Sequence, residues 1–284
     1  MNDTPQLDLR PVYGLLEQRS GLAFATARQA EADARLRAHM EHRRAATVED
    51  LLRLLRHSAA EYDALLDHLL ADVGGFFRVA SVFEALADRV LPEMHMKKFW
   101  DKPRSLRMWS AGCGAGEEPY SVALTVHDCF GTAESWNIHL LATDLSLKAL
   151  QDAERGVYSA EALARVTPQQ LEESFLRVGA MYMVKPRLRH MVTFSRMNLV
   201  EGAYMGRFDI ILCTAVLASL RTDHRARVLQ RFYEALEPGG YLFLSASDEI
   251  DGLLRFEEVG RNGIVLWQKP SAGARRMLET AEIA

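Results

Sequence analysis

The chain has 284 residues, of which 49% are hydrophobic and 25% are charged, and its formal net charge is −4. This length and composition suit one large globular domain or two unequal ones, and the slightly acidic balance argues against a nucleic-acid partner. No apolar run approaches the roughly 18 residues that a membrane helix needs, so we expect no membrane insertion.

The cysteines indicate a reducing compartment. Cys113, Cys129 and Cys213 form no CxxC pair. That spacing argues against a zinc site or a disulfide framework and is typical of a cytoplasmic protein. The nine histidines form no obvious ligand cluster with carboxylates, so we expect no metal.

The first part of the chain predicts helices. Apolar residues recur at spacings of three and four in residues 48–57 and 62–70, without the alternation of a strand. Residues 35–44 concentrate four arginines and two histidines on one expected helix, which is either a solvated face or a docking surface for an acidic partner. Gly74-Gly75 breaks the helical pattern before Phe76.

Strands and helices alternate from residue 106 onward, which predicts a mostly parallel sheet covered on both faces. Expected strands lie at 106–112, 137–144, 191–199, 207–214 and 241–247, and Asn262-Gly263 predicts a closing hairpin. The last long helix should begin near Asp223 as N-cap and end at Gly239-Gly240. Residues 158–190 interrupt the alternation with a capped helix and a small strand excursion. We therefore expect a helical domain and linker at residues 1–75 and a second domain at 76–284, with an insert at 158–190.

The turn "SAGCGAGEEP" lies where a strand ends and a helix begins, the position at which doubly wound sheets bind ligands. No lysine follows as a P-loop requires, and Gly112, Gly114 and Gly116 do not match G-x-G-x-x-G. Glu117 and Glu118 at the helix start would repel a pyrophosphate but attract a cation.

Asp144 ends the next expected strand, where a carboxylate can accept hydrogen bonds from two ribose hydroxyls. A ribose, a cationic end and no phosphate together describe S-adenosylmethionine. One of the two glutamates can instead be an ordinary residue of the first helical turn.

Several blocks then resemble one family. "FFRVASVFEAL", "SAGCGAGEEPYSVAL", "LATDLSLKALQDAERGVY", "RFDIILC" and "LEPGGYLFLS" are similar, in order and spacing, to the CheR family of chemoreceptor glutamate methyltransferases, over roughly residues 65–267. The resemblance implies an α/β fold: a Rossmann-like class I methyltransferase sheet, a small inserted antiparallel β-subdomain and an N-terminal all-helical domain. It also implies S-adenosylmethionine as cofactor and S-adenosylhomocysteine as product.

The resemblance implies roles by motif position. Glu117 would hold the methionine portion and Asp144 the ribose, Asn198 and Leu199 would flank the adenine, and Arg78 would lie near the methyl group and place the substrate carboxylate. Phe76 and Phe77 are expected in the core. The remaining cofactor-binding positions implied are Asp72, Gly74, Ala111, Gly112, Thr214 and Ala215.

The sequence departs from the family pattern beside the expected site. Asp72 and Gly74 replace the usual Asn-x-Thr, and "CTAVLASL" places Thr214, Ala215 and Ser219 where arginine, asparagine and tyrosine are usual. A glutamate acceptor is already ionised at neutral pH and needs no general base, so the loss of a tyrosine hydroxyl affects alignment. The alternatives are a weakened or inactive module that binds the cofactor and a signalling partner, and a methyltransferase with another acceptor.

The expected partner is the cytoplasmic helical domain of a chemoreceptor-like protein. The stretch at residues 175–194 holds a single glycine, Gly179, and is shorter than the tethering form of the family, so no receptor tail-peptide tether is expected. Recruitment would fall to Arg35, Arg37, Arg43 and Arg44.

Overall fold

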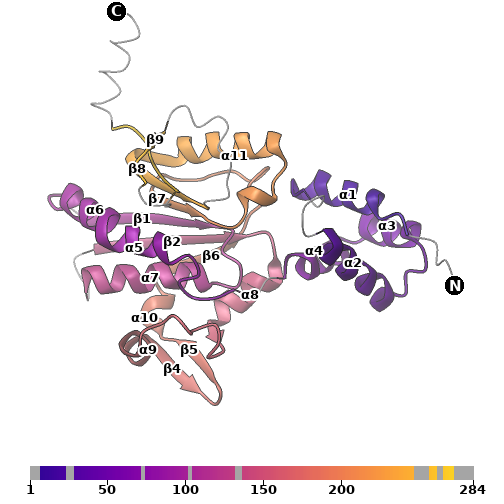
Figure 1. Cartoon of the computed structure of the whole chain (residues 1–284), viewed down its shortest axis with the longest axis horizontal. Helices are drawn as coiled ribbons and strands as arrows, with labels where there is room; N and C mark the ends of the chain where they lie inside the picture. Colours follow the sequence, from indigo (N-terminus) through magenta and orange to yellow (C-terminus); the bar gives the residue numbers. More distant parts are fainter. Residues whose placement is uncertain are drawn as a thin grey trace, which may run out of the picture.

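The structure, a computed structural model, describes residues 7–23, 29–71, 74–101, 104–131, 136–245, 256–260 and 265–271. Asp72 and the Asn262-Gly263 turn lie outside these ranges. Helices α1 to α4 form one body, and the sheet with its flanking helices forms another (Figure 1). No helix in the described part of the chain is long and apolar enough to cross a membrane.

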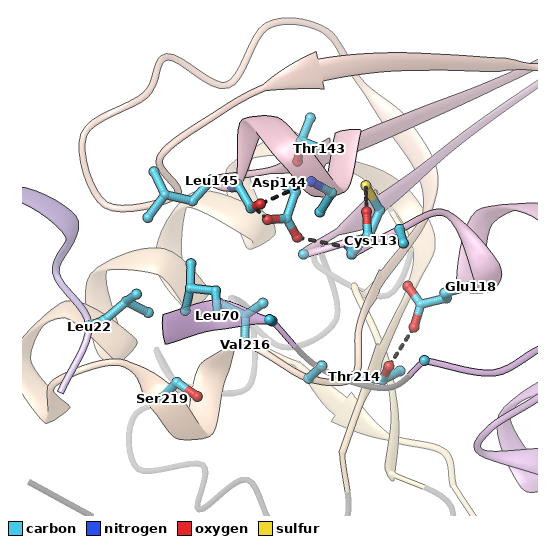
Figure 2. Close-up of a pocket in the computed structure, with 18 of the residues that line it drawn as sticks. Leu22, Leu70, Cys113, Glu118, Thr143, Asp144, Leu145, Thr214, Val216 and Ser219 are labelled. Atoms are coloured by element: carbon cyan, nitrogen blue, oxygen red, sulfur yellow. Dashed lines mark hydrogen bonds between the residues drawn. The ribbon is translucent and has the colours of Figure 1, made fainter. Parts of the chain in front are cut away.

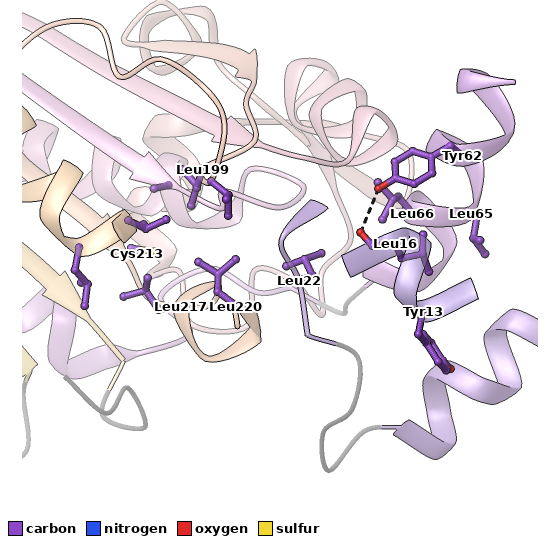
Figure 3. Close-up of a cluster of buried hydrophobic side chains, with 14 of the residues drawn as sticks. Tyr13, Leu16, Leu22, Tyr62, Leu65, Leu66, Leu199, Cys213, Leu217 and Leu220 are labelled. Carbon is purple, nitrogen blue, oxygen red and sulfur yellow. Dashed lines mark hydrogen bonds between the residues drawn. The ribbon is translucent and has the colours of Figure 1, made fainter. Parts of the chain in front are cut away.

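The N-terminal body is all helical, as expected. It consists of α1 (Arg10–Ser20), α2 (Gln29–Arg43), α3 (Val48–His57) and α4 (Ala59–Leu70). Local signals define the helix ends: Thr47 and Asp50 form a capping box at α3, and the Ser58 side chain caps α4. The Tyr62 hydroxyl donates to the Leu16 carbonyl at 3.5 Å, inside the apolar cluster shown in Figure 3.

The second body is a seven-stranded sheet in the order β6-β2-β1-β7-β8-β10-β9. Its parallel strands are β1 (Arg104–Ala111), β2 (Trp136–Asp144), β6 (Val192–Arg196), β7 (Phe208–Cys213) and β8 (Leu236–Leu244), while β9 (Glu257–Glu258) and β10 (Val265–Gln268) pair antiparallel. The central strand β1 lies between β2 and β7, so the order reverses there. The carboxyl end of β1 is therefore the place where this fold binds ligands.

Helices cover both faces of the sheet. On one face, Met108 and Ile210 belong to an apolar cluster with residues of α7 (Glu117–Phe130). The same cluster includes residues of three consecutive helices, α5 (Ala80–Ala85), η1 (Leu86–Val90) and α6 (Leu91–Lys98). The adjacent residues Trp109 and Ile211 point to the other face, toward α11 (Thr222–Ala235). Because successive strand residues alternate in direction, both faces are apolar, as the predicted parallel sheet requires.

A small antiparallel sheet interrupts the alternation of strands and helices, which confirms the predicted insert subdomain. Its order is β3-β5-β4, from β3 (Val157–Tyr158), β4 (Phe175–Val178) and β5 (Met181–Val184), and it is accompanied by α9 (Pro168–Ser174) and α10 (Pro186–Arg189). Thr167 and Gln170 form the expected capping box of α9. Phe76, which is 1% exposed, contacts Tyr158 and Phe175 edge-on and so joins the interdomain linker to this subdomain.

Two predicted boundaries of the last long helix are wrong. α11 begins at Thr222, and Asp223 lies in its first turn, where it pairs with Arg221 at 3.1 Å instead of capping the helix. The helix ends at Ala235 and the chain enters β8 directly. Gly239-Gly240 lies within β8, where the register against β7 shifts between Phe208 and Ile210. The glycines therefore permit an irregularity in the strand, and Gly239 has φ +73°.

Candidate cofactor site

A cavity of about 450 Å³ lies at the carboxyl ends of the central strands, between the two bodies. This volume is in the range of sites for cofactor-sized molecules. The glycine turn, the end of β2, the segment after β7 and the helical domain all contribute to its wall, and Figure 2 shows Leu22 and Leu70 of the helical domain facing the Asp144 side.

The glycine turn leaves β1 with its backbone tied to the neighbouring strand. The Gly112 and Cys113 N–H groups donate to the Thr143 carbonyl at 2.8 and 3.0 Å. Gly112, Gly114 and Gly116 all have positive φ. A Cβ on Gly112 would lie 1.9 Å from the Val216 side chain, so only glycine fits there. Ala111, the residue before, is fully buried in the core and is not among the residues that line the cavity.

Asp144 lies beside this turn with both carboxylate oxygens occupied. The Gly114 N–H donates to one oxygen at 2.9 Å and the Ser146 N–H to the other at 2.8 Å. Burial raises the pKa of Asp144, while these two backbone donors oppose the rise. Each oxygen keeps a further lone pair, so the group can still accept hydrogen bonds from a ligand.

Glu117 and Glu118 both line the cavity, but they have different surroundings. Glu117 lies next to Gly74, where a Cβ would come within 2.5 Å of its carboxylate. Glu118 accepts the Ser110 hydroxyl at 2.7 Å on one oxygen and the Thr214 hydroxyl on the other. Burial raises the pKa of Glu118, and the nearby Arg78 charge opposes the rise.

The other predicted site residues come from three segments. Gly74 and Arg78 line the cavity from the interdomain linker, Asn198 and Leu199 from the segment after β6, and Thr214 and Ala215 from the segment after β7. Asn198 donates to the Arg19 carbonyl at 3.1 Å and accepts from the Val200 N–H at 2.9 Å. The structure thus brings together all the described site residues except Ala111.

Arg78 is presented by an unusual backbone. Phe77 has φ +53°, uncommon for a residue with a side chain, and its N–H donates to the Ser121 hydroxyl at 2.9 Å. Arg165 donates to the Phe77 and Arg78 carbonyls at 3.1 and 2.9 Å. Strained backbone held by surrounding contacts is frequent at functional sites, and here it precedes the exposed cation of the cavity wall.

Sequence reasoning did not foresee the bonding partners of Glu118, and it did not assign Arg35 and Asp67 to the cavity wall. Glu118 was the neighbour of the chosen Glu117, and its hydroxyl partner Thr214 is 96 positions away in the chain. Arg35 and Asp67 reach the cavity from the helical domain, where helical periodicity carries no signal for a ligand site. Among the described residues, no cluster of histidine, cysteine and carboxylate groups could hold a metal.

The donor set fits the predicted cofactor. Carboxylates at the start of α7 suit a cation, Asp144 suits a ribose, and the apolar side chains of Leu69, Leu70 and Leu199 suit an adenine. A Rossmann-like sheet with such a site defines a class I methyltransferase that uses S-adenosylmethionine.

Comparison with known proteins identifies the family. The model of the CheR methyltransferase SAM-binding domain matches residues 72–261, and that of the CheR methyltransferase all-alpha domain matches residues 8–70. The chain belongs to the CheR methyltransferase family. It is 31% identical to the chemotaxis protein methyltransferase of Vibrio parahaemolyticus over 92% of this chain and 96% of that protein. It is 31% identical to chemotaxis protein methyltransferase 1 of Pseudomonas aeruginosa over 84% and 88%.

Proposed function

We propose that this methyltransferase forms methyl esters on glutamate side chains of a chemoreceptor-like protein in the cytoplasm. The observation that carries the proposal is Arg78, an exposed cation on the wall of the cofactor cavity. A guanidinium can pair with a carboxylate in two parallel hydrogen bonds and so orient an acceptor glutamate. The names of the relatives, chemotaxis protein methyltransferases, agree with a receptor substrate.

The chemistry asks little of the protein beyond binding and alignment. When bound, S-adenosylmethionine supplies an activated methyl group. An acceptor glutamate with the ordinary pKa of about 4.3 is already ionised at neutral pH and needs no general base. Glu118 is poorly placed to act as a base, because Ser110 and Thr214 each donate to one of its oxygens. Glu117, Asp144, Asn198 and Leu199 would hold the cofactor, and Arg78 would orient the acceptor.

Two departures from the family pattern lie in the segment after β7. Ala215 and Ser219 are exposed, and both line the cavity. Neither offers the amide or the phenol that is usual there, so alignment of the acceptor would depend more strongly on Arg78. The weakened-module alternative predicts cofactor binding without transfer.

Recruitment would not use a tail peptide. β4 and β5 are joined by a two-residue turn, with Val178 opposite Met181 and Gly179 at φ +64°. This tight hairpin has no loop to clamp an added strand at its end.

Methyl transfer from labelled S-adenosylmethionine to receptor cytoplasmic fragments tests the proposal. We expect label that is released as methanol by base, which marks an ester. Arg78→Ala should lower kcat/KM by about tenfold or more, the effect of losing a hydrogen-bonded charge pair. S-adenosylhomocysteine affinity should change less. Label that is stable to base would contradict the ester assignment. If the protein binds the cofactor but transfers no label, the inactive-module alternative is favoured.

A further inference from the structure

Asp67, on the last turn of α4, bonds to the turn that follows Asp144. One Asp67 oxygen accepts the Ser146 hydroxyl at 2.7 Å and lies 3.4 Å from the Lys148 N–H. Ser146 is the N-cap of α8 (Leu147–Arg155), and its hydroxyl oxygen accepts the Ala149 N–H at 3.0 Å. A carboxylate from the helical domain therefore reaches the start of a helix of the catalytic domain.

This contact determines where the Ser146 hydroxyl points. The hydroxyl carries a single proton, and its oxygen is already used as an acceptor by Ala149. Asp67 takes that proton as a charge-assisted hydrogen bond, and its negative charge lies at the favourable end of the α8 dipole. The Ser146 backbone N–H is thereby held toward Asp144, to which it donates at 2.8 Å.

The position of α4 itself is held by further contacts. Arg35 of α2 donates to the carbonyls of Leu69 and Ala71 at 3.0 and 2.5 Å, which satisfies acceptors left open at the end of α4. Asp63, one turn before Asp67, pairs with Arg196, which also donates to the Leu145 carbonyl at 3.2 Å. The turn that follows Asp144 is thus bonded to α4 at two points.

We propose that Asp67 is a positioning residue for cofactor binding: it fixes the Ser146 turn and thereby orients the Asp144 carboxylate. The proposal rests on the ribose-binding role proposed above for Asp144. It makes the helical domain part of the cofactor site through a hydrogen-bond relay, in addition to any contact with substrate. By linkage, cofactor binding and docking of α4 strengthen each other.

Calorimetric titration of the full chain with S-adenosylhomocysteine tests the relay. Asp67→Ala should weaken binding by about five- to tenfold, near the value of one ordinary hydrogen bond, because the lost contact acts on the cofactor through Ser146 and Asp144. Asp67→Asn keeps an oxygen acceptor for Ser146 and should retain at least half of the wild-type affinity. Glu61→Ala is the matched control, because it removes an α4 carboxylate whose ion pair is with Arg43 inside the helical domain and not with the turn that follows Asp144. It should change affinity less than twofold.

A double-mutant cycle separates positioning from general support. In an Asp144→Ala background, Asp67→Ala should cause no further loss, because the carboxylate that it orients is gone. Additive losses, equal losses for Glu61→Ala and Asp67→Ala, or an Asp67→Asn variant as weak as Asp67→Ala would each overturn the inference. Unchanged affinity of Asp144→Ala would overturn the ribose assignment itself, whereas a weak Asp144→Ala with an intact Asp67→Ala would overturn only the relay.

Discussion

Two glycines of the same turn are constrained differently. Both Gly112 and Gly114 have positive φ, +85° and +54°. A side chain on Gly112 would collide with Val216, whereas nothing lies within 4 Å of the Cβ position of Gly114. The first position is therefore restricted by backbone strain and by contact, and the second by strain alone.

Gly112→Ala should lower the free energy of unfolding by more than Gly114→Ala, which should cost about 1 kcal/mol from backbone strain alone. Because Val216 and the turn both line the cavity, Gly112→Ala should also abolish measurable S-adenosylhomocysteine binding. Denaturant unfolding and calorimetry of the two variants measure these effects. Equal destabilisation by the two substitutions would show that Val216 moves aside without cost.

Glu118 gives the site a pH dependence. Its folded-state pKa is raised above the ordinary value of 4.5 because the carboxylate is buried. The folded protein then holds this proton more tightly than the unfolded chain, so its contribution favours folding at low pH and is lost as pH rises from about 4.5 through the folded-state pKa.

We expect Glu118→Gln to raise the free energy of unfolding at pH 7 relative to wild type, with a difference that shrinks toward zero at pH 4. The amide can still bond the Ser110 and Thr214 hydroxyls without a buried charge. The exposed Glu41→Gln serves as the control and should show no such trend. A Glu118→Gln variant less stable than wild type at pH 7 would mean that the two hydroxyl bonds outweigh the burial of the charge.

At the scale of elements, α2 carries two kinds of arginine. Arg35 is tied to Glu31 at 2.6 Å and to the α4 carbonyls, and Arg43 pairs with Glu61 at 2.8 Å. These two arginines are engaged within the helical domain, so recruitment of a partner should depend more on the other two. Arg37 on α2 and Arg44, directly after the helix, are exposed, and Arg37 lies 3.7 Å from Asp33.

Reversing Arg37 and Arg44 to glutamate should weaken binding of a receptor cytoplasmic fragment about tenfold at low salt, with little loss of stability, since exposed pairs contribute little to folding. The difference should diminish at 1 M salt, where the Debye length is about 3 Å. Arg35→Glu should instead lower the melting temperature, because it leaves the end of α4 uncapped. Affinity that is unchanged by the double reversal, or that requires a receptor tail peptide, would contradict recruitment by α2.

At the scale of the whole molecule, the helical domain lies directly on the cofactor side of the sheet. The Ala23 N–H donates to the Ser219 carbonyl at 2.7 Å, and Leu22 and Leu220 form an isolated antiparallel bridge. Figure 3 shows Leu22 beside Leu217 and Leu220, so one apolar cluster is continuous between the two bodies. Both bodies contribute residues to the cavity wall.

S-adenosylhomocysteine at 100 times its Kd should therefore stabilise the chain by about 2.7 kcal/mol, with one unfolding transition for both bodies. Hydrogen exchange should slow in α4 and in residues 21–23 as well as around the glycine turn. Protection limited to the sheet would show that the helical domain does not contribute to cofactor binding.

Signals that lie within a few residues of one another were sufficient to predict the fold class and the residues at the centre of the candidate site. The glycine turn and its glutamates, Asp144 at a strand end, and Gly156 as the left-handed cap of α8 are determined within a few residues of chain. Their physical basis is local: backbone angles, capping and the alternation of strand and helix. The Gly239-Gly240 prediction failed because glycine ends a helix and permits a strand irregularity equally well, and pairing with β7 decides between them.

The sequence by itself therefore determined the fold class, the cofactor and the residues nearest the glycine turn. Only the tertiary structure decided how Glu118 is bonded, since Thr214 reaches it from the end of the neighbouring strand β7. Only the tertiary structure likewise placed Asp67 and Arg35 on the cavity wall. The physical reason is that helical periodicity records which side of a helix is apolar. It does not record which polar group another domain will bring within hydrogen-bond distance.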